Sequence, residues 1–585
     1  MNHWTTPLLV AAALVALPLT SSAGSESPLA DPTPSPSAVA AGASDADAHP
    51  AGRTPEGAKE EKDKTKDDDQ DTLIEELEDR LDAVERHSVL DSLEFSGDYR
   101  FEAHSIRATV PAHFDGMRVQ NMLVNTLFFA GASGRPPASL DEVRGFIREH
   151  YADYLYFTQS LTFDQIRQAM GQFPPEMQQQ LFQMLLPAAA VPAYSANNDV
   201  LYTNRLRLRF DAKVADNVSF SGRLGMYKVF GDSTGVQVLN GQPTSVNVDG
   251  TTVGVPNSDI LRVERAYFSW NRIGGSKAYL SIGRRPSTEG APLTLRNDEP
   301  RGGTPLGALI NYQFDGITFG YGIGEHSTAR LCYGLGYESG FGNGDVLKLP
   351  QDRLKDVHFL GVNWDVWDDE KTFVQVTVAR AFDVTDGFNG LVVLPNNPVT
   401  GEPIAAPVVL RFTPSANLGD LDLGSIVAIR KQGPLDLFAS ASFNYSRPEL
   451  VTGPFGGLFS DPFDTPEKQT GTMFYAGARY HLKGGKTKLG VEFNHGSKYW
   501  MNFAVAEDDI IAPKTSARGD LLEAYVTHRI SPRFIAKAAW IKYWYDYSGS
   551  GWQVGAPKPL DENPILGLPT YDEAGKFSLS ITARF

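Results

Sequence analysis

Between Leu93 and Phe585 the sequence alternates strand-like segments with connections whose lengths also alternate. In about 16 segments, apolar and polar residues alternate with a period of two, which is the pattern of a strand with one apolar face. These segments are 93–104, 200–213, 217–230, 260–271, 277–284, 316–324, 328–339, 355–366, 371–382, 419–431, 434–446, 471–482, 486–496, 519–530, 533–545 and 575–585. Short connections lie at 213–217, 272–276, 368–370, 431–434, 483–485 and 531–533. The long ones are rich in Gly, Pro, Asn and Asp and lie at 105–199, 231–259, 285–315, 340–354, 383–418, 447–470, 497–518 and 546–574. This alternation predicts an antiparallel β-barrel with tight turns at one membrane face and long loops at the other.

Hydropathy agrees with a barrel and disagrees with membrane-spanning helices. The chain has 585 residues, 42% of them apolar, and a mean hydropathy of −0.25. Beyond the N-terminus no apolar run approaches the roughly 20 residues that a membrane-spanning helix needs. Only every second residue of a barrel strand meets lipid, which hides such strands from hydropathy averages. The single cysteine, Cys332, excludes an intramolecular disulfide, and the net charge of −17 disfavours nucleic acid as a partner.

The number of strands is expected to be even, because single-chain bacterial barrels keep both chain ends on one side of the membrane. Residues 306–314 form one further apolar run that would make the number odd. We therefore assign 306–314 to a loop or an in-folded segment. The predicted fold is an all-β transmembrane barrel of about 16 antiparallel strands, with 18 as the alternative.

The last strand candidate, Lys576–Phe585, has the most regular pattern. Its apolar positions are Phe577, Leu579, Ile581, Ala583 and Phe585, and they alternate with Ser578, Ser580, Thr582 and Arg584. In a barrel the apolar face would contact outer-membrane lipid and the polar face would meet water. The terminal Phe585 resembles the C-terminal signature of bacterial outer-membrane barrels, which implies recognition by the barrel assembly machinery.

Three segments precede the predicted barrel. Residues 1–23 combine a short apolar run with small residues at 21–23, which predicts a secretory signal peptide. Residues 24–70 are rich in Pro, Ala and acidic residues and predict a disordered tether. Within 71–92, apolar residues at spacings of three and four form a seam of about two heptads, typical of a short periplasmic coiled coil. This helix could pack on the periplasmic rim of the barrel or assemble a trimer.

The order of these segments resembles that of a known family. A signal, an acidic tether, a short coiled coil, the strand Leu93–Phe101 (LEFSGDYRF) and the strand end Ser281–Pro286 (SIGRRP) are similar to a family of bacterial outer-membrane porins of unknown substrate. The similarity covers about residues 71–585. It implies a porin-like channel and no particular solute.

The parity of side chains along a strand predicts which residues face the barrel interior. A barrel of about 16 strands is too wide for its own side chains to fill, so inward residues meet water. In the segment 203–210, turning Leu206 and its neighbours towards lipid places Arg205, Arg207 and Arg209 inside. The opposite choice would cost about 2–4 kcal/mol for each arginine near the midplane. The same parity predicts the remaining pore-lining residues: Arg223, Arg262, Glu264, Arg479, Glu492, Glu523, Arg529 and Arg584.

Aromatic residues are expected in girdles at the two edges of the membrane. Tyr267, Trp540 and Trp544 suit outward positions. Phe268 and Trp270 share the parity of Arg262 and would face the lumen unless a β-bulge intervenes.

Two hypotheses concern what narrows the pore and selects solutes. The arginines could attract anionic solutes, or neighbouring lumen acids could neutralise them. A charged group in and beside the 285–315 loop could line a constriction if the loop folds inward, or could remain solvated outside: Arg284, Arg285, Arg296, Asp298, Glu299 and Arg301.

Residues 105–199 form the one long connection that is predicted to be helical. Apolar residues recur at helical spacing in 141–154, 162–170 and 174–186, with Ser139 and Thr162 placed as N-caps. The insertion could enter the barrel as a plug or cap its extracellular mouth.

These features together predict an outer-membrane porin, forming a homotrimer, through which small hydrophilic solutes diffuse passively, with a preference for anions if the arginines stay unneutralised. The alternatives are a plugged, ligand-specific transporter and a barrel that tethers envelope layers. No cofactor or metal is expected. The sequence has no His-Glu-x-x-His helix and no Gly-x-Ser-x-Gly elbow, so we do not expect an enzyme.

Overall fold

The computed structural model describes residues 93–231, 244–245, 256, 259–342, 346–349, 354–389, 414–453, 456–504, 509–567 and 570–585. The predicted signal peptide (1–23), tether (24–70) and coiled coil (71–92) lie outside the described residues.

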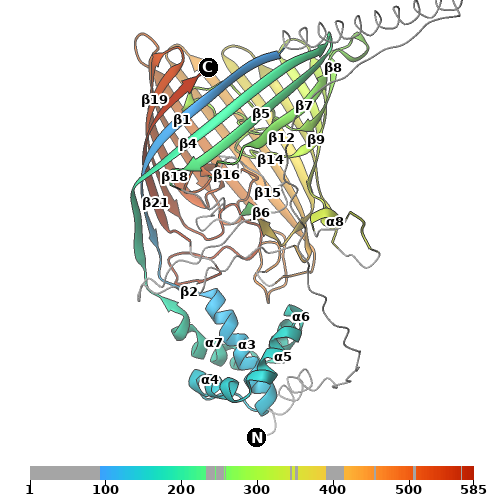
Figure 1. The fold of residues 1–585 in the computed structure, drawn as a ribbon, viewed down its shortest axis with the longest axis vertical. Coiled ribbons are helices and arrows are strands. Elements are labelled where there is room, and N and C mark those ends of the chain that lie inside the picture. Colours follow the sequence, from blue (N-terminus) through green and yellow to red (C-terminus); the bar gives the residue numbers. More distant parts are fainter. Residues whose placement is uncertain are drawn as a thin grey trace, which may run out of the picture. The chain divides into compact units, whose positions relative to one another are not determined.

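Sixteen antiparallel strands close into a barrel, as the sequence predicts (Figure 1). They are β1 (Leu93–Val110), β4 (Tyr194–Ala215), β5 (Val218–Val229), β7 (Arg262–Trp270), β8 (Ala278–Arg284), β9 (Asp315–Ile323), β10 (Ser327–Tyr337), β11 (Val357–Asp368), β12 (Thr372–Thr385), β14 (Asn417–Gln432), β15 (Leu435–Pro448), β16 (Thr470–His481), β17 (Thr487–Gly496), β18 (Gly519–Ser531), β19 (Phe534–Tyr545) and β21 (Glu573–Arg584). Each pairs with its neighbours along the chain, and β1 pairs with β21 to close the barrel, with Asp98 opposite Arg584.

The two ends of the barrel differ in the length of their connections. Turns such as 216–217, 433–434 and 532–533 gather at one end, which we call the short-turn end. The chain terminus at Phe585 lies there too, and its backbone exchanges hydrogen bonds with Gly97 at 2.9 and 3.0 Å. The opposite, long-loop end carries the long connections.

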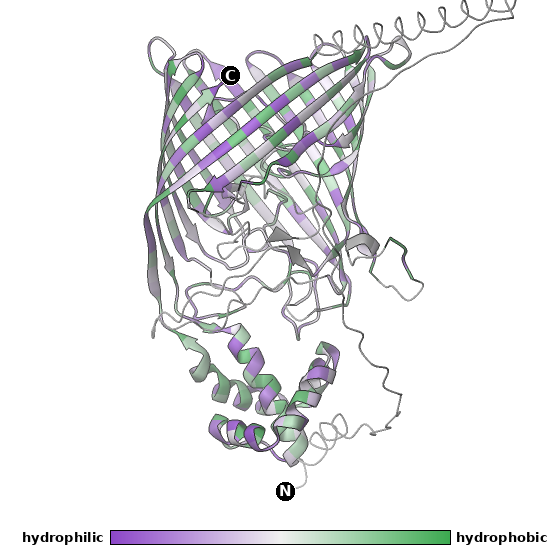
Figure 2. Ribbon diagram, in the orientation of Figure 1, coloured by the Kyte–Doolittle hydropathy of each residue, from purple (hydrophilic) through white to green (hydrophobic). Residues whose placement is uncertain are grey.

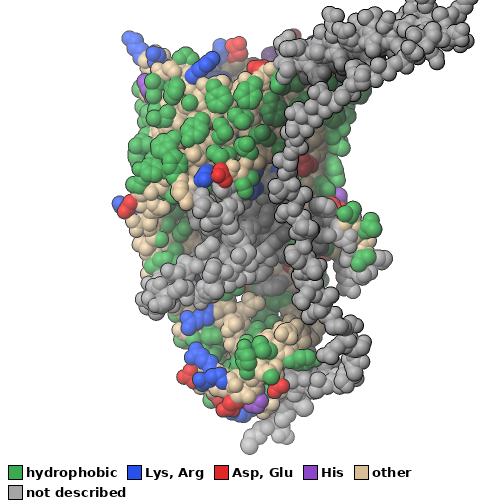
Figure 3. Space-filling model, viewed as in Figure 1, with side chains coloured by type: hydrophobic (Ala, Val, Ile, Leu, Met, Phe, Trp, Pro, Cys, Tyr) green, Lys and Arg blue, Asp and Glu red, His purple; other side chains and the backbone are tan. Residues whose placement is uncertain are grey.

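Burial alternates along the strands and separates an apolar outer face from the lumen. On β15, Leu437 and Phe443 are 39% and 46% exposed, whereas Phe438 between them is 6% exposed. Figure 2 shows the resulting change from hydrophobic to hydrophilic residues along the strands. In Figure 3 hydrophobic side chains gather on the visible outer surface of the barrel. Trp540 and Trp544 face outward, as predicted.

A β-bulge on β7 decides the orientation of its aromatic residues. The register between β5 and β7 shifts beside Glu264, so that Glu264 and the following Arg265 are both buried. The shift turns Phe268 and Trp270 outward, where they are 41% and 42% exposed. The prediction that Tyr267 faces outward is wrong, because after the bulge its ring lies 5.3 Å from the inward guanidinium of Arg285.

Long connections fold back into the lumen and fill one side of it. Apolar wall residues of β11 to β16 pack against them: Val357, Phe359, Ala379, Ala381, Leu421, Leu423, Val427, Phe438, Met473 and Tyr475. The loop residues of this core include Leu306, Leu309, Tyr312, Leu458, Phe459, Trp500, Phe503 and Trp552. Segment 306–314 is therefore in-folded, and its Ile310 pairs with Phe503 in an isolated parallel bridge. This packed half of the lumen is largely apolar.

The first long connection is helical, as expected, and contains α3 (Gly116–Ser133), α4 (Leu140–Glu149), α5 (Tyr151–Ser160), α6 (Phe163–Gln172) and α7 (Pro175–Ala189). Ser139 and Thr162 accept hydrogen bonds from the backbone as N-caps of α4 and α6. Helix α3 escaped prediction, although Asp115 caps its start and Gly134 its end. Because β1 continues to Val110 and β4 begins at Tyr194, the strands take residues that the sequence assigned to the insertion.

The helices pack around a core of their own, which includes Leu123, Leu127, Met170 and Leu185. They rest on a small sheet of β2 (His113–Asp115), β3 (Ala190–Val191) and β20 (Ile565–Leu566). The lumen core contains none of the described helix residues. This arrangement favours a helical cover at the long-loop end over a plug.

The remaining described elements are small. They are β6 (Thr244–Ser245), which pairs with β13 (Phe388–Asn389), the helical turn α8 (Ser339–Gly342), and the 3₁₀ turns η1 (Ile273–Gly275), η2 (Leu295–Asn297) and η3 (Lys514–Ser516). In the described part of the chain, no helix is both long and apolar enough to cross a membrane.

Candidate functional site

The connection between β8 and β9, residues 285–314, crosses the lumen and is held by ion pairs. Its turn η2 ends at Asp298, whose carboxylate lies 3.3 Å from Arg479 and 3.0 Å from Arg529 and also pairs with Lys488. These three cations belong to the walls of β16, β17 and β18. The connection therefore reaches from the long-loop end to the short-turn half of the barrel.

The root of the same connection is anchored to the arginines of β4, β5 and β7. Glu289 pairs with Arg207, with Arg223 at 2.6 Å and with Arg265 at 3.0 Å. Glu264, in the β7 bulge, also pairs with Arg207 and Arg223. Carboxylates thus surround these buried arginines, as the neutralisation hypothesis expects for ion-paired wall residues.

The three arginines of β4 that were predicted to face the lumen differ in their surroundings. Arg205 is buried and pairs with Asp98 at 2.9 Å and with Glu299 at 3.8 Å. Arg207 joins the Glu289 cluster. Arg209 has a largely exposed side chain and pairs with Asp211 at 2.6 Å near the short-turn end. Only the first two lie against the in-folded loop.

The carboxylates of the in-folded loops are held in their ionised form. Burial alone would raise the pKa of Glu289, but Arg207, Arg223 and Arg265 hold it well below its usual range. Burial likewise opposes ionisation of Asp298, and its cationic partners, with Lys488 first among them, lower its pKa. Electrostatic attraction outweighs desolvation at both positions.

A second in-folded connection, 497–518, adds a buried ionic network on the other side of the lumen. Arg296 of the first loop pairs with Asp509 at 2.9 Å and with Glu523 of β18 at 3.3 Å. Lys514 is fully buried and donates to Glu523 at 2.8 Å and to Glu492. Asp509 also pairs with Lys576 of β21 at 3.1 Å. Burial alone would raise its pKa, but Arg296, Lys576 and Lys514 outweigh burial and lower it.

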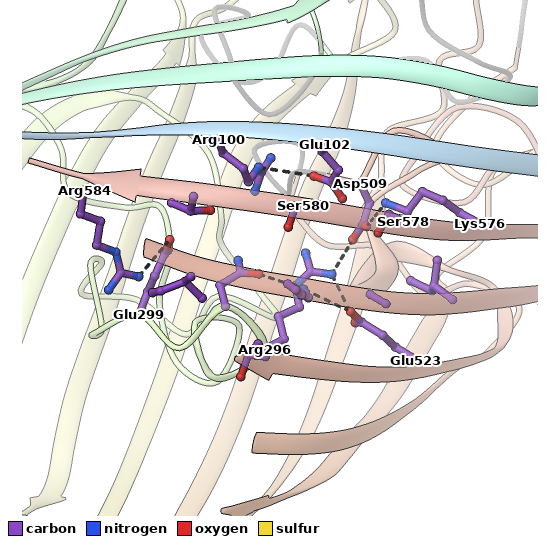
Figure 4. Close-up of a pocket in the computed structure, with 17 residues that line it drawn as sticks. Arg100, Glu102, Arg296, Glu299, Asp509, Glu523, Lys576, Ser578, Ser580 and Arg584 are labelled. Atoms are coloured by element: carbon purple, nitrogen blue, oxygen red, sulfur yellow. Dashed lines mark hydrogen bonds and ion pairs between the residues drawn. The ribbon is translucent and has the colours of Figure 1, made fainter. Parts of the chain in front are cut away.

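Between the two loops and the wall of β1, β18, β19 and β21 lies a cavity of about 40 Å³, which we call the β21 slot (Figure 4). Its cationic lining residues are Arg100, Arg296, Lys537, Lys576 and Arg584. Its acidic lining residues are Glu102, Glu299, Asp509 and Glu523. Hydroxyl groups of Thr527, Ser578, Ser580 and Thr582 complete the polar lining. A cavity of this size and polarity has room for water.

The structure brings most of the predicted pore-lining residues to the two loops or the slot. Nine of them contact loop residues or one another through ion pairs in the lumen: Arg205, Arg207, Arg223, Glu264, Arg479, Glu492, Glu523, Arg529 and Arg584. Arg209 lies apart, and Arg262 is partly buried at the long-loop end of β7.

The predicted constriction residues do not form one group. Arg296, Asp298 and Glu299 lie together at the loop tip. Arg301 pairs with Asp368 at 3.0 Å on another part of the wall, and Arg285 stacks on Tyr267. The hypothesis fails for Arg284: it pairs with the exposed Asp315, which shares the outward parity of Ile317 and Phe319. Arg284 lies on the outer face beside Asp315, because alternate residues of β9, starting with Asp315, face outward.

Several residues of the site escaped the sequence analysis. Lys537, Lys576 and Arg100 have the inward parity of their strands, and the same argument that selected Arg584 would have found them. Arg265 was hidden by the bulge, which reverses parity. Asp509 and Lys514 sit in a loop, where no periodicity exists to indicate their direction. In the described ranges no three His, Cys, Asp or Glu side chains are grouped to hold a metal ion.

The sequence was also compared with known proteins. A family model described as "Protein of unknown function (DUF3373)" matches residues 195–585. The chain belongs to the DUF3373 family. The match spans the barrel from the start of β4 to the C-terminus and omits β1 and the helical insertion. No curated protein matches the sequence.

Among solved structures this DUF3373 protein is similar to bacterial outer-membrane proteins at low sequence identity. An anion-selective porin from Comamonas acidovorans has 10% identity and a TM-score of 0.39, covering 84% of this chain and 99% of that chain. OprB from Pseudomonas putida has 10% identity and a TM-score of 0.38, covering 86% and 96%. OmpT of Vibrio cholerae, expressed in the outer membrane, has 12% identity and a TM-score of 0.35, covering 84% and 97%. The barrel assignment rests on the strand pairing of this chain itself.

Proposed function

We propose that this DUF3373 protein is a porin-like channel of the bacterial outer membrane that admits small hydrophilic solutes by passive diffusion. The observation that carries the proposal is a closed barrel whose outer face is apolar and whose lumen holds a charged, water-sized slot beside an in-folded loop. An apolar belt on a closed barrel suits lipid, because no strand edge is left unpaired. Diffusion through such a lumen needs neither cofactor nor energy.

A rim of outward polar contacts at the long-loop end supports placement in a membrane. Such contacts between neighbouring strands are Arg380–Asp422–Arg447, His495–Asp520 and Lys542–Glu573. Charges on the outer face of a barrel cost little only near the membrane surface. The rim thus favours an apolar belt that ends at this level. With the long-loop end at the cell surface, the short-turn end and the N-terminal tether would face the periplasm. β21 would then be the strand that the assembly machinery recognises.

The charge distribution of the slot favours a modest preference for anions. Four cations, Arg100, Lys537, Lys576 and Arg584, project from the wall. Acids pair with each of the four, so the excess of positive charge is small: among the charged lining residues, five are cationic and four are acidic. The buried arginines of β4 and β5 contribute less, since Glu264 and Glu289 neutralise them. We therefore place the selectivity in the slot.

Conductance of the purified full-length protein in planar lipid bilayers tests the proposal. A channel should give steady current steps that persist without added ligand, and a salt gradient should give a reversal potential displaced towards that of the anion. A protein that never conducts contradicts the channel. A protein that conducts only after residues 111–193 are deleted would support the plugged transporter, and loss of envelope attachment without any conductance would support tethering.

A further inference from the structure

We propose that permeating anions follow the inner face of β21, where Lys576 and Arg584 bracket three hydroxyl groups, those of Ser578, Ser580 and Thr582. This inference rests on the proposed channel and adds the route and the class of solute. The five residues occupy alternate positions of one strand and all line the slot (Figure 4 labels four of them). Alternate positions of a strand point to the same face, so the five groups form a track about 26 Å long at 3.3 Å per residue.

The opposite half of the lumen holds a cavity of about 50 Å³ beside Ile310, Tyr312 and Phe359, but its lining is mainly apolar. There the wall of β11 to β16 packs against Leu306, Tyr312 and Trp500 in an apolar core. An ion entering this core would lose its hydration without gaining polar partners, which is strongly unfavourable.

The sector of β4, β5 and β7 is closed for a different reason. Arg207, Arg223 and Arg265 are bound to Glu289, which belongs to the root of the in-folded loop. Opening a path there would separate the buried ion pairs that these arginines make with Glu289 and, for Arg207 and Arg223, with Glu264. Breaking such buried ion pairs costs several kcal/mol. The slot beside β21 is the remaining sector, and its cavity has a charged and polar lining.

The hydroxyl groups of β21 are available to a solute. Those of Ser578, Ser580 and Thr582 make no hydrogen bond to any residue in the described part of the protein, although the first two side chains are 4% and 8% exposed. Their partners must therefore be water or a passing solute. By contrast, Ser442, which also faces inward, donates to Ser425 at 2.8 Å in the packed half. Free hydroxyls beside cations can replace part of the hydration shell of an anion.

The solute class follows from the charge and the size of the slot. Lys576 and Arg584 attract anions from either end, and the hydroxyls between them carry no charge to hold an anion tightly. A polar cavity of about 40 Å³ has room for small hydrated groups and suits inorganic anions and short carboxylates. Glu299 and Asp509 pair with Arg584 and Lys576, so the ends of the track keep only part of their positive charge and would hold an anion weakly.

Cysteine modification at Ser580 tests the route. In a Cys332→Ala background, Ser580→Cys should react with a negatively charged methanethiosulfonate reagent during current recording, and the conductance should fall by about half or more because the adduct occupies the track. Ser442→Cys is the matched control: it is an inward serine of similar burial in the packed half, and its conductance should stay unchanged. An unaffected Ser580→Cys channel, or a blocked Ser442→Cys channel, overturns the route.

A second variant avoids dependence on one residue. Lys576→Gln combined with Arg584→Gln should lower the ratio of anion to cation permeability by about twofold or more, while the steps persist. If the unmodified protein conducts and the double variant keeps its reversal potential, the track is wrong and the channel stands. If the unmodified protein does not conduct, the proposed function fails and the track fails with it.

Discussion

The carboxylate of Asp298 lies 3.0 Å from the guanidinium of Arg529. Arg529 is near the short-turn end of β18, whereas Asp298 belongs to a connection that leaves the barrel at its long-loop end. The pair therefore fixes the tip of an in-folded loop deep inside the lumen. Arg479 and Lys488 converge on the same carboxylate, so one acid holds three strands to the loop.

Removing the charge of Asp298 should loosen this loop tip. In Asp298→Asn the three wall cations lose their shared acid, and the tip should move away from β16, β17 and β18. We expect a single-channel conductance about 1.5 to 2 times that of the unmodified protein, because the loop narrows the lumen. Planar-bilayer recording measures it.

Asp461→Asn is the control for that variant. Asp461 is an acid of another long connection and pairs with Lys558 away from the loop tip. Its conductance should match that of the unmodified protein. Equal conductance in both variants would mean that Asp298 does not hold the constriction.

The docking of the loop should be insensitive to pH until strongly acidic conditions. The folded protein lowers the pKa of Asp298 below the ordinary 3.8. A group with a lowered folded pKa contributes stability that is complete above its unfolded pKa and is lost as the pH falls through the folded value. Conductance should therefore stay constant between about pH 7 and pH 5 and rise only below the ordinary carboxyl pKa. A transition centred near pH 6 would contradict this assignment, and Asp298→Asn should show a smaller rise in acid.

The apolar belt predicts a depth-dependent cost for charge on the outer face. Val491 faces outward near the middle of β17, and His495 faces outward on the same strand near the long-loop end. Val491→Arg should reduce the free energy of unfolding in lipid vesicles by about 2–4 kcal/mol, whereas His495→Arg should cost about 0–1 kcal/mol. Similar losses of unfolding free energy in the two variants would contradict an apolar belt that is centred near Val491 and ends near His495.

Arg518 should be a major contributor to the order of the long connections. Its guanidinium is buried and donates to the carbonyl oxygens of Trp500, Ser548 and Trp552 at 2.9, 2.8 and 2.7 Å. Burial lowers its pKa to about 9. Arg518→Met removes the donor of these three hydrogen bonds, so we expect the free energy of unfolding to fall by about 2–4 kcal/mol.

Denaturant unfolding of the full chain in detergent micelles measures the effect of Arg518→Met. The exposed Arg533, in a short turn, provides the control, and Arg533→Met should change the free energy of unfolding by less than about 0.5 kcal/mol. An equally small effect of Arg518→Met would show that the carbonyl contacts do not stabilise the fold.

Sequence periodicity was sufficient for the barrel because the information is local. The direction of a strand side chain depends on the parity of its position, as at Leu437 and Phe438, and a short turn ties each strand to the next. The C-terminal strand illustrates both its success and its limit. Its alternation predicted that Leu579 faces lipid and that Ser580 faces the lumen, but not that the hydroxyl of Ser580 borders the β21 slot.

Only the tertiary structure decided where the alternation of inward and outward residues is interrupted and which connections fold into the lumen. One extra residue beside Glu264 reversed the orientations of Tyr267 and Phe268, and nothing in the local pattern marks such a bulge. The partners of the arginines also depend on long-range folding, since Arg223 and Glu289 are 66 residues apart in sequence. Periodicity is a property of neighbours along a strand, whereas the choice of which carboxylate meets which arginine depends on how a loop crosses the lumen. The sequence by itself determined the barrel and its two faces, and the folded loops decided how much of the lumen remains open to water.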